Sequence, residues 1–174
     1  KFARTKRSLE EYLQKMLLVI DLNQSHYHAR QKAYFDCYKK WAVLKVLKGK
    51  YARQNTLKLA EELLSVTKKY DFTELTVDVL RTLRLFYGSL IGDHKQYLHY
   101  KEQAAHYDGM VAAENLAEEL YTELAFHFTN SKSAKKELQQ DALKSYAQLS
   151  EALTKYDSYR LHFSGRLIQL MTYT

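Results

Sequence analysis

The histidines are the residues of this chain best suited to metal binding, and their spacing does not favour it. His26 and His28 are two residues apart, which places them on different sides of a helix. His94 and His99 are five residues apart, whereas a metal-binding pair on one helix face is four apart. No His-Glu-x-x-His motif occurs. We therefore expect no metal site and no cofactor.

Other patterns typical of catalysis are also missing. The sequence has neither the Gly-x-x-x-x-Gly-Lys phosphate loop nor a Gly-x-Ser-x-Gly turn. Its single cysteine, Cys37, lies in an apolar helical stripe, where a buried core thiol is expected rather than a nucleophile. The adjacent carboxylates Glu61-Glu62 and Glu118-Glu119 are expected on solvated helix faces. We predict that the chain is not an enzyme.

Tyrosine and lysine remain as residues that could bind a partner. Eight of the fifteen tyrosines mostly fall on apolar stripes, where packing between helices is the expected role: Tyr34, Tyr38, Tyr87, Tyr97, Tyr100, Tyr107, Tyr121 and Tyr146. A ligand groove lined by tyrosines is the alternative, because tyrosine offers a large contact area at low entropy cost.

The basic residues are concentrated in the first third of the chain. Residues 1–60 contain fourteen Lys and Arg against four Asp and Glu (net +10), whereas residues 61–174 contain thirteen against sixteen (net −3). A solvated helix surface is the expected role of these lysines, and contact with the phosphates of nucleic acid or anionic lipid is the alternative. No helix-turn-helix, RNP or zinc-finger pattern accompanies them. The lysines on the second expected helix and its turn are Lys39, Lys40, Lys45, Lys48 and Lys50.

The composition predicts helices as the elements that position these residues. The chain has no proline and five glycines, and inside a helix proline costs about 3 kcal/mol and glycine about 1. No apolar run approaches the roughly 18 residues of a membrane-spanning helix. A cytoplasmic location is expected, and the start at Lys1 suggests a fragment of a longer protein.

Apolar residues recur at helical spacing and predict about eight helices. Ser8 with Glu11 resembles a capping box at the first helix, and Asp71 with Glu74 is expected to cap the fourth. The expected core includes Trp41, Leu83, Leu120 and Leu124. The first three expected helices span 8–22, 25–48 and 52–70, and the fourth runs from Asp71 to a turn at Gly92-Asp93. The fifth spans 94–107 and ends at a break at Asp108-Gly109, and the sixth runs from this break to a loop at Thr129–Ser133. The seventh follows this loop and ends at Tyr156, and the eighth runs from Asp157 onward.

Three Tyr-Asp pairs suggest an internal repeat of paired helices. Tyr70-Asp71, Tyr107-Asp108 and Tyr156-Asp157 are each expected where one helix closes and the next opens, at spacings of 37 and 49 residues. Two helices per unit at such a period are typical of an α-solenoid.

One segment, from Leu83 to Ala104, resembles a tetratricopeptide-repeat (TPR) unit. Its Gly92-Asp93 matches the family's turn between two helices, and Tyr97 and Tyr100 fall near the second-helix positions. Weaker copies are Trp41-Ala42 with Gly49-Lys50-Tyr51 and Ala60, and Leu116-Ala117 with Ala142 and Tyr146, so that the resemblance covers 34–156. It implies a right-handed superhelix of hairpins whose first helices line a concave groove.

These observations predict an all-α chain of stacked antiparallel hairpins, in one domain over residues 1–174. The expected function is a protein-interaction scaffold that holds a peptide or helix of a partner in the TPR-like groove. The alternative is a regulatory helical domain that associates with nucleic acid through its basic first third. The residues expected beside the buried stripes, facing the groove, are Tyr38, Lys39, Arg81, Arg84, Glu118 and Tyr121.

Overall fold

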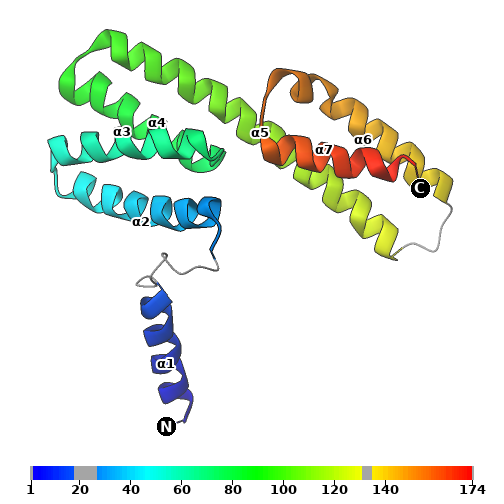
Figure 1. Ribbon diagram of the computed structural model, residues 1–174, viewed down its shortest axis with the longest axis horizontal. Coiled ribbons are helices and arrows are strands. Elements are labelled where there is room, and N and C mark those ends of the chain that lie inside the picture. The colour runs from blue at the N-terminus through cyan, green and yellow to red at the C-terminus, as the bar shows by residue number, and fades with distance from the viewer. Residues whose placement is uncertain (1, 18–26, 131–134, 174) are drawn as a thin grey trace. The chain divides into compact units, whose positions relative to one another are not determined.

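The computed structural model describes residues 2–17, 27–130 and 135–173, and over these ranges the chain is helical without a strand, which confirms the all-α prediction (Figure 1). It divides into two compact units, Lys1–Tyr70 and Asp71–Thr174, called unit 1 and unit 2 below. No helix in the described part is long and apolar enough to cross a membrane. The helices are α1 (Phe2–Leu17), α2 (Ala29–Gly49), α3 (Arg53–Lys69), α4 (Thr73–Leu85), the π-helix η1 (Phe86–Ile91), α5 (His94–Asn130), α6 (Lys135–Lys155) and α7 (Tyr159–Met171).

In unit 1, α2 and α3 form an antiparallel hairpin (Figure 1). Cys37 and Leu44 of α2 are fully buried, as is Ala60 of α3, so the expectation of a buried thiol is confirmed. Trp41 is only half-buried, and the ammonium group of Lys45 lies 4.6 Å from its ring centroid. The expectation that Trp41 is a core residue is therefore met only in part, and the ring makes a cation–π contact with Lys45.

The predicted start of the first helix is wrong. Helix α1 begins at Phe2, so Ser8 lies inside the helix and caps nothing, and Glu11 instead forms an ion pair with Arg7 at 3.2 Å. The four-residue spacing of Leu9 and Leu13 predicts that both face inward, but they are 56% and 53% exposed. The rest of the predicted helix, residues 18–22, lies outside the described residues, as do Ser25 and His26.

In unit 2, helical spacing predicts one buried stripe that runs from α4 to Leu90. Leu75, Val79, Leu83 and Phe86 are buried, but Leu90 is 42% exposed. The cause is η1, because a π-helix bonds residue i to i+5 and so turns the following side chains away from the 3.6-residue register.

The turn at Gly92-Asp93 is confirmed. Gly92 has a φ of +79°, a left-handed conformation that glycine adopts without steric cost. An oxygen of the Asp93 carboxylate accepts the backbone N–H of Gln96 at 3.0 Å and so caps α5. Asp71, in contrast, does not cap α4, whose N-terminal boundary residue is Phe72.

The predicted break at Asp108-Gly109 is also wrong, because α5 continues through it as one helix of 37 residues. A methyl group on Gly109 would overlap the hydroxyl of Tyr156. The glycine therefore serves a close contact between α5 and Tyr156 rather than a turn. As a consequence Tyr107-Asp108 lies within a helix, whereas Tyr70-Asp71 and Tyr156-Asp157 do lie between two helices.

The core of unit 2 joins α5, α6 and α7. It includes Ala117 and Leu124 of α5, Leu149 of α6, and Leu161 and Ile168 of α7, all of them buried. Of the two residues that were expected in this core, Leu124 is buried and Leu120 is half-buried against it. The seven α-helices and one π-helix of the described residues replace the expected eight, since two predicted helices merge into α5.

Candidate functional site

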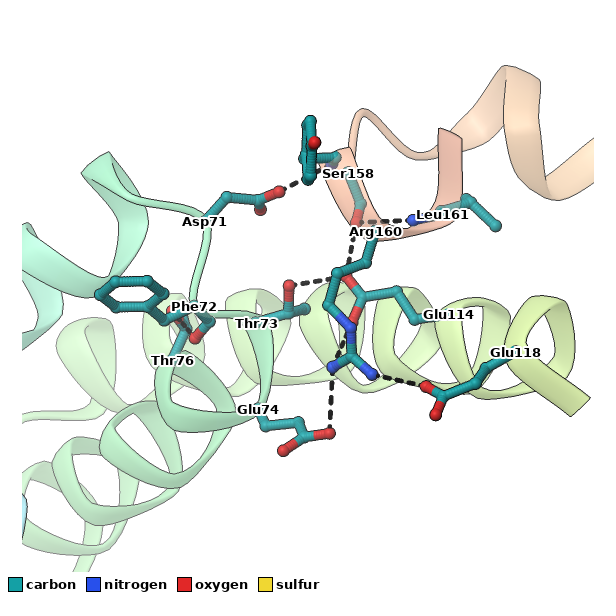
Figure 2. A network of polar contacts seen from close by, with 11 residues as sticks. Asp71, Phe72, Thr73, Glu74, Thr76, Glu114, Glu118, Ser158, Arg160 and Leu161 are labelled. Carbon is teal, nitrogen blue, oxygen red and sulfur yellow. Dashed lines mark hydrogen bonds and ion pairs between the residues drawn. The ribbon is translucent and has the colours of Figure 1, made fainter. Parts of the chain in front are cut away.

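A buried carboxylate lies at the centre of unit 2, where the N-termini of α4 and α7 meet the middle of α5. Glu114 of α5 is only 2% exposed. One of its oxygens, Oε1, accepts hydrogen bonds from the hydroxyl of Thr73 at 2.7 Å and from the hydroxyl of Ser158 at 2.5 Å (Figure 2). The Ser158 hydroxyl in turn accepts the N–H of Leu161 and so caps α7. This carboxylate therefore ties three helices together.

The other carboxylate oxygen of Glu114 faces a single cation. Its Oε2 is buried, accepts no hydrogen bond, and lies 3.4 Å from Nη1 of Arg160 on α7. The same guanidinium contacts Glu74 of α4 at 3.2 Å and Glu118 of α5 at 2.8 Å (Figure 2). Desolvation lowers the pKa of Arg160, but the three carboxylates outweigh it and hold that pKa above its ordinary value. Three negative charges thus surround one positive charge.

Asp71 makes a further link in this network. It has a φ of +57°, and an oxygen of its carboxylate accepts the backbone N–H of Tyr159 at 2.8 Å (Figure 2). A carboxylate at the first turn of α7 is well placed, because the N-terminus of a helix carries a partial positive charge. Burial and the charge of Asp71 together raise the pKa of Tyr107 on α5.

An open cleft of about 510 Å³ lies beside Arg160, and carboxylates dominate its wall. We call it the acidic cleft. Among the described residues that line it, Arg160 is the one basic residue. Four of its lining residues are glutamates, which come from α4 and α5: Glu74, Glu118, Glu119 and Glu123.

The structure separates the predicted site residues of unit 2 into different environments. Glu118 lies in the acidic cleft, while Tyr121 is half-buried against the core of unit 2. Arg81 pairs with Asp108 on α5 at 2.7 Å. Arg84 lines a second cleft, at the start of α5, and no partner contacts its guanidinium among the described residues. Nothing brings these four side chains into one site.

The predicted residues of unit 1 lie on α2 and its end. Tyr38 is exposed and its ring centroid lies 4.7 Å from that of Tyr34. Lys39 and Lys40 are half-buried, and Lys40 pairs with Asp36 at 2.8 Å, an interaction that raises the pKa of Lys40. The remaining lysines are Lys45 over Trp41, the half-buried Lys48, and the exposed Lys50.

Glu114 and Arg160 are the two central residues that the sequence analysis did not select. Glu114 could have been found, because it interrupts the apolar stripe of Met110, Ala113 and Ala117 with a charge. Arg160 could not, since it lies 46 residues further on and nothing in the spacing pairs the two.

In the described residues, no group of three or more His, Cys, Asp or Glu side chains is arranged to hold a metal ion. Comparison with models of known protein families, with curated proteins and with solved structures finds no match for this chain. The TPR resemblance therefore stays a prediction that rests on the sequence.

Proposed function

We propose that this chain is a protein-interaction domain and that the acidic cleft of unit 2 binds a basic segment of a partner protein. The TPR resemblance supports the general role, because proteins of that family present helix hairpins to peptides. The excess of carboxylates in the cleft is the observation that indicates a basic partner. A cytoplasmic location fits this role and the single free cysteine.

The charges in the cleft leave room for an external cation. Arg160 is shared by Glu74, Glu114 and Glu118, so it balances one of these three charges. Glu119 and Glu123 add two more carboxylates to the wall. A lysine or arginine from a partner would be attracted to this excess, and such complementarity mainly sets specificity and the rate of association.

The buried part of the network would keep the cleft in shape. Thr73 and Ser158 fix Glu114, and Glu114 holds the guanidinium of Arg160 at the wall of the cleft. A wall that is already ordered loses little conformational entropy when a partner binds, which favours affinity. Arg160 would therefore position the wall, whereas Glu119 and Glu123 are available to the partner.

Fluorescence polarisation with a labelled lysine- and arginine-rich peptide tests this function. We expect saturable binding even though the chain carries a net charge of +7, which disfavours non-specific capture of a basic peptide. The variant Glu119→Gln/Glu123→Gln should bind about two- to tenfold more weakly, since each exposed charge pair contributes about 0.2–1 kcal/mol.

The matched control is Glu61→Gln/Glu62→Gln in α3, which removes the same charge from unit 1. This control should bind the peptide about as well as the unaltered chain. Equal weakening in both variants would mean that net charge, not the cleft, controls binding. In that case the proposed site would be wrong.

A further inference from the structure

The second cleft of unit 2, at the turn between η1 and α5, has a different chemistry from the acidic cleft. Its volume is about 450 Å³, and none of the described residues that line it carries a carboxylate. Arg84 from the last turn of α4 and His94 from the first turn of α5 both line it. Leu85 and the ring of Tyr97 supply apolar surface. Clefts of this size commonly hold small ligands.

Arg84 is the feature that points to a ligand. Among the described residues, two arginine side chains are half-buried, Arg84 and Arg160. Three carboxylates surround Arg160, but Arg84 has no hydrogen bond or ion pair within the described part of the chain. Arginine presents a planar set of donors that matches a carboxylate in two-point fashion, and a guanidinium that lines a cleft without an internal partner can bind such an anion.

The nearest acidic side chain on the turn is already engaged. The Asp93 carboxylate accepts the N–H of Gln96 and so faces the start of α5, and it does not line the cleft. The backbone N–H groups of Gly92 and Asp93 both bond to the carbonyl of Tyr87 at 3.0 Å, which fixes the turn. In the described part of the chain, the Asp93 carboxylate thus caps α5 and is not bonded to Arg84.

The apolar side of the cleft depends on Gly88. A Cβ atom at this position would lie 2.8 Å from Cδ2 of Tyr97, so the absence of a side chain allows the ring to pack against η1. The centroids of the Tyr97 and His94 rings are 6.1 Å apart, which gives the cleft two neighbouring aromatic rings. A flat apolar or aromatic group can pack against such rings.

We infer that this cleft binds a small carboxylate with an apolar or aromatic body, whose carboxylate contacts Arg84 and whose body packs on Tyr97. This proposal is independent of the acidic cleft, with which it shares no lining residue. A free carboxylic acid and the carboxyl terminus of a peptide would both present this chemistry.

Titration of the ¹⁵N-labelled full chain with benzoate, followed by NMR, tests the inference. We expect saturable shifts of the Ser89 and Gly92 amide signals. Acetate, which lacks the aromatic body, should bind more weakly, and benzamide, which lacks the charge, should cause no saturable shift. A short peptide that ends in phenylalanine is compared with the same peptide amidated at its C-terminus. Binding of the free-carboxylate peptide alone would show that the cleft also accepts a peptide terminus. If neither peptide binds, the ligand class is the free carboxylic acid.

Two variants separate charge from shape. Arg84→Gln should weaken benzoate binding at least about tenfold, because a charge-assisted hydrogen-bond pair is lost. Gly88→Ala should also weaken it, because the methyl group displaces Tyr97 while Arg84 is kept. The matched control is Arg81→Gln, which removes an arginine of the same helix that is paired with Asp108.

Three results would overturn the inference. The first is the absence of saturable shifts with benzoate. The second is equal binding by Arg84→Gln and Arg81→Gln. The third is binding of inorganic phosphate in preference to benzoate, which would mean that the apolar wall plays no part.

Discussion

Glu114 shows how one buried side chain can control several elements of unit 2. Its carboxylate accepts two hydroxyl donors and faces a guanidinium, so removal of the carboxylate leaves Thr73, Ser158 and Arg160 without their buried partner. Loss of one member of a buried ion pair costs about 3–5 kcal/mol. Because the Arg160 side chain is 40% exposed, solvent screens part of that loss.

We therefore predict that Glu114→Ala lowers the free energy of unfolding by about 2–4 kcal/mol. Urea denaturation followed by circular dichroism measures it. Glu119→Ala, an exposed residue of the same helix, is the control and should change stability by less than about 0.5 kcal/mol. Similar midpoints for the two variants would contradict the structural role of Glu114.

Gly109 provides a second prediction at the residue scale. In an ordinary helix interior, Gly→Ala stabilises by about 1 kcal/mol. Here a methyl group would meet the hydroxyl of the buried Tyr156, so Gly109→Ala is expected to destabilise by about 1–2 kcal/mol. The double variant Gly109→Ala/Tyr156→Phe should recover part of the loss, since the overlapping oxygen is gone. If Gly109→Ala raised the denaturation midpoint, the close contact would be absent.

Cys37 gives a prediction about pH. Burial is the main cause that raises the pKa of its thiol to about 11. The folded state then holds a proton that the unfolded state releases near pH 9, so this residue makes stability fall as pH rises from about 9 to 11. Urea denaturation across this range should show a smaller fall for Cys37→Ala than for the unaltered chain. Parallel pH profiles would show that the thiol is not desolvated.

At the scale of elements, η1 decides which leucines of the α4 stripe carry stability. Leu83 is fully buried, and its truncation to alanine should cost about 2–5 kcal/mol. Leu90, seven residues further along, is exposed after the π-turn, so Leu90→Ala should cost less than about 1 kcal/mol. Denaturation midpoints of the two variants measure the difference. Equal losses would indicate a regular α-helix through residue 91.

The helices themselves were predictable from the sequence. Whether a given glycine marks a turn or a close contact between helices was not. The absence of proline and the 3.6-residue spacing are sufficient to predict an all-α chain, and Gly92 was correctly predicted as a turn. Gly109 was wrongly predicted as a break, because an Asp-Gly pair also suits a close helix contact. The partner in that contact, Tyr156, lies 47 residues away, and local propensity contains no information about it.

The candidate sites were less predictable than the helices for a similar reason. Glu118 and Arg84 were both selected from helical geometry, and each lines a cleft. The sequence could not show that Asp108 already pairs with Arg81, or that Arg160 joins Glu118 across 42 residues. Which charges remain available to a partner depends on such long-range pairs, and spacing along one helix does not reveal them.

For the molecule as a whole, the uneven charge separates the two functions under consideration. The first 60 residues carry +10, and the rest carries −3 and includes the acidic cleft. A partner that is a basic peptide would use the acidic part, whereas nucleic acid would use the lysines at the end of α2. The two kinds of binding should therefore respond to different substitutions.

We predict that Lys48→Ala/Lys50→Ala leaves binding of the basic peptide unchanged and weakens the binding of a labelled single-stranded oligonucleotide. These two lysines are preferred to Lys45, which covers Trp41 and whose loss would also alter packing. If both contact phosphate, the slope of log affinity against log salt should fall by about 1.4, since each contact contributes about 0.7. If the peptide is the natural class of partner, the oligonucleotide should bind more weakly than the peptide when both are measured at the same salt concentration, about 0.15 M. Tighter oligonucleotide binding at that salt, lost in the lysine variant and unaffected by Glu119→Gln/Glu123→Gln, would favour the nucleic-acid function instead.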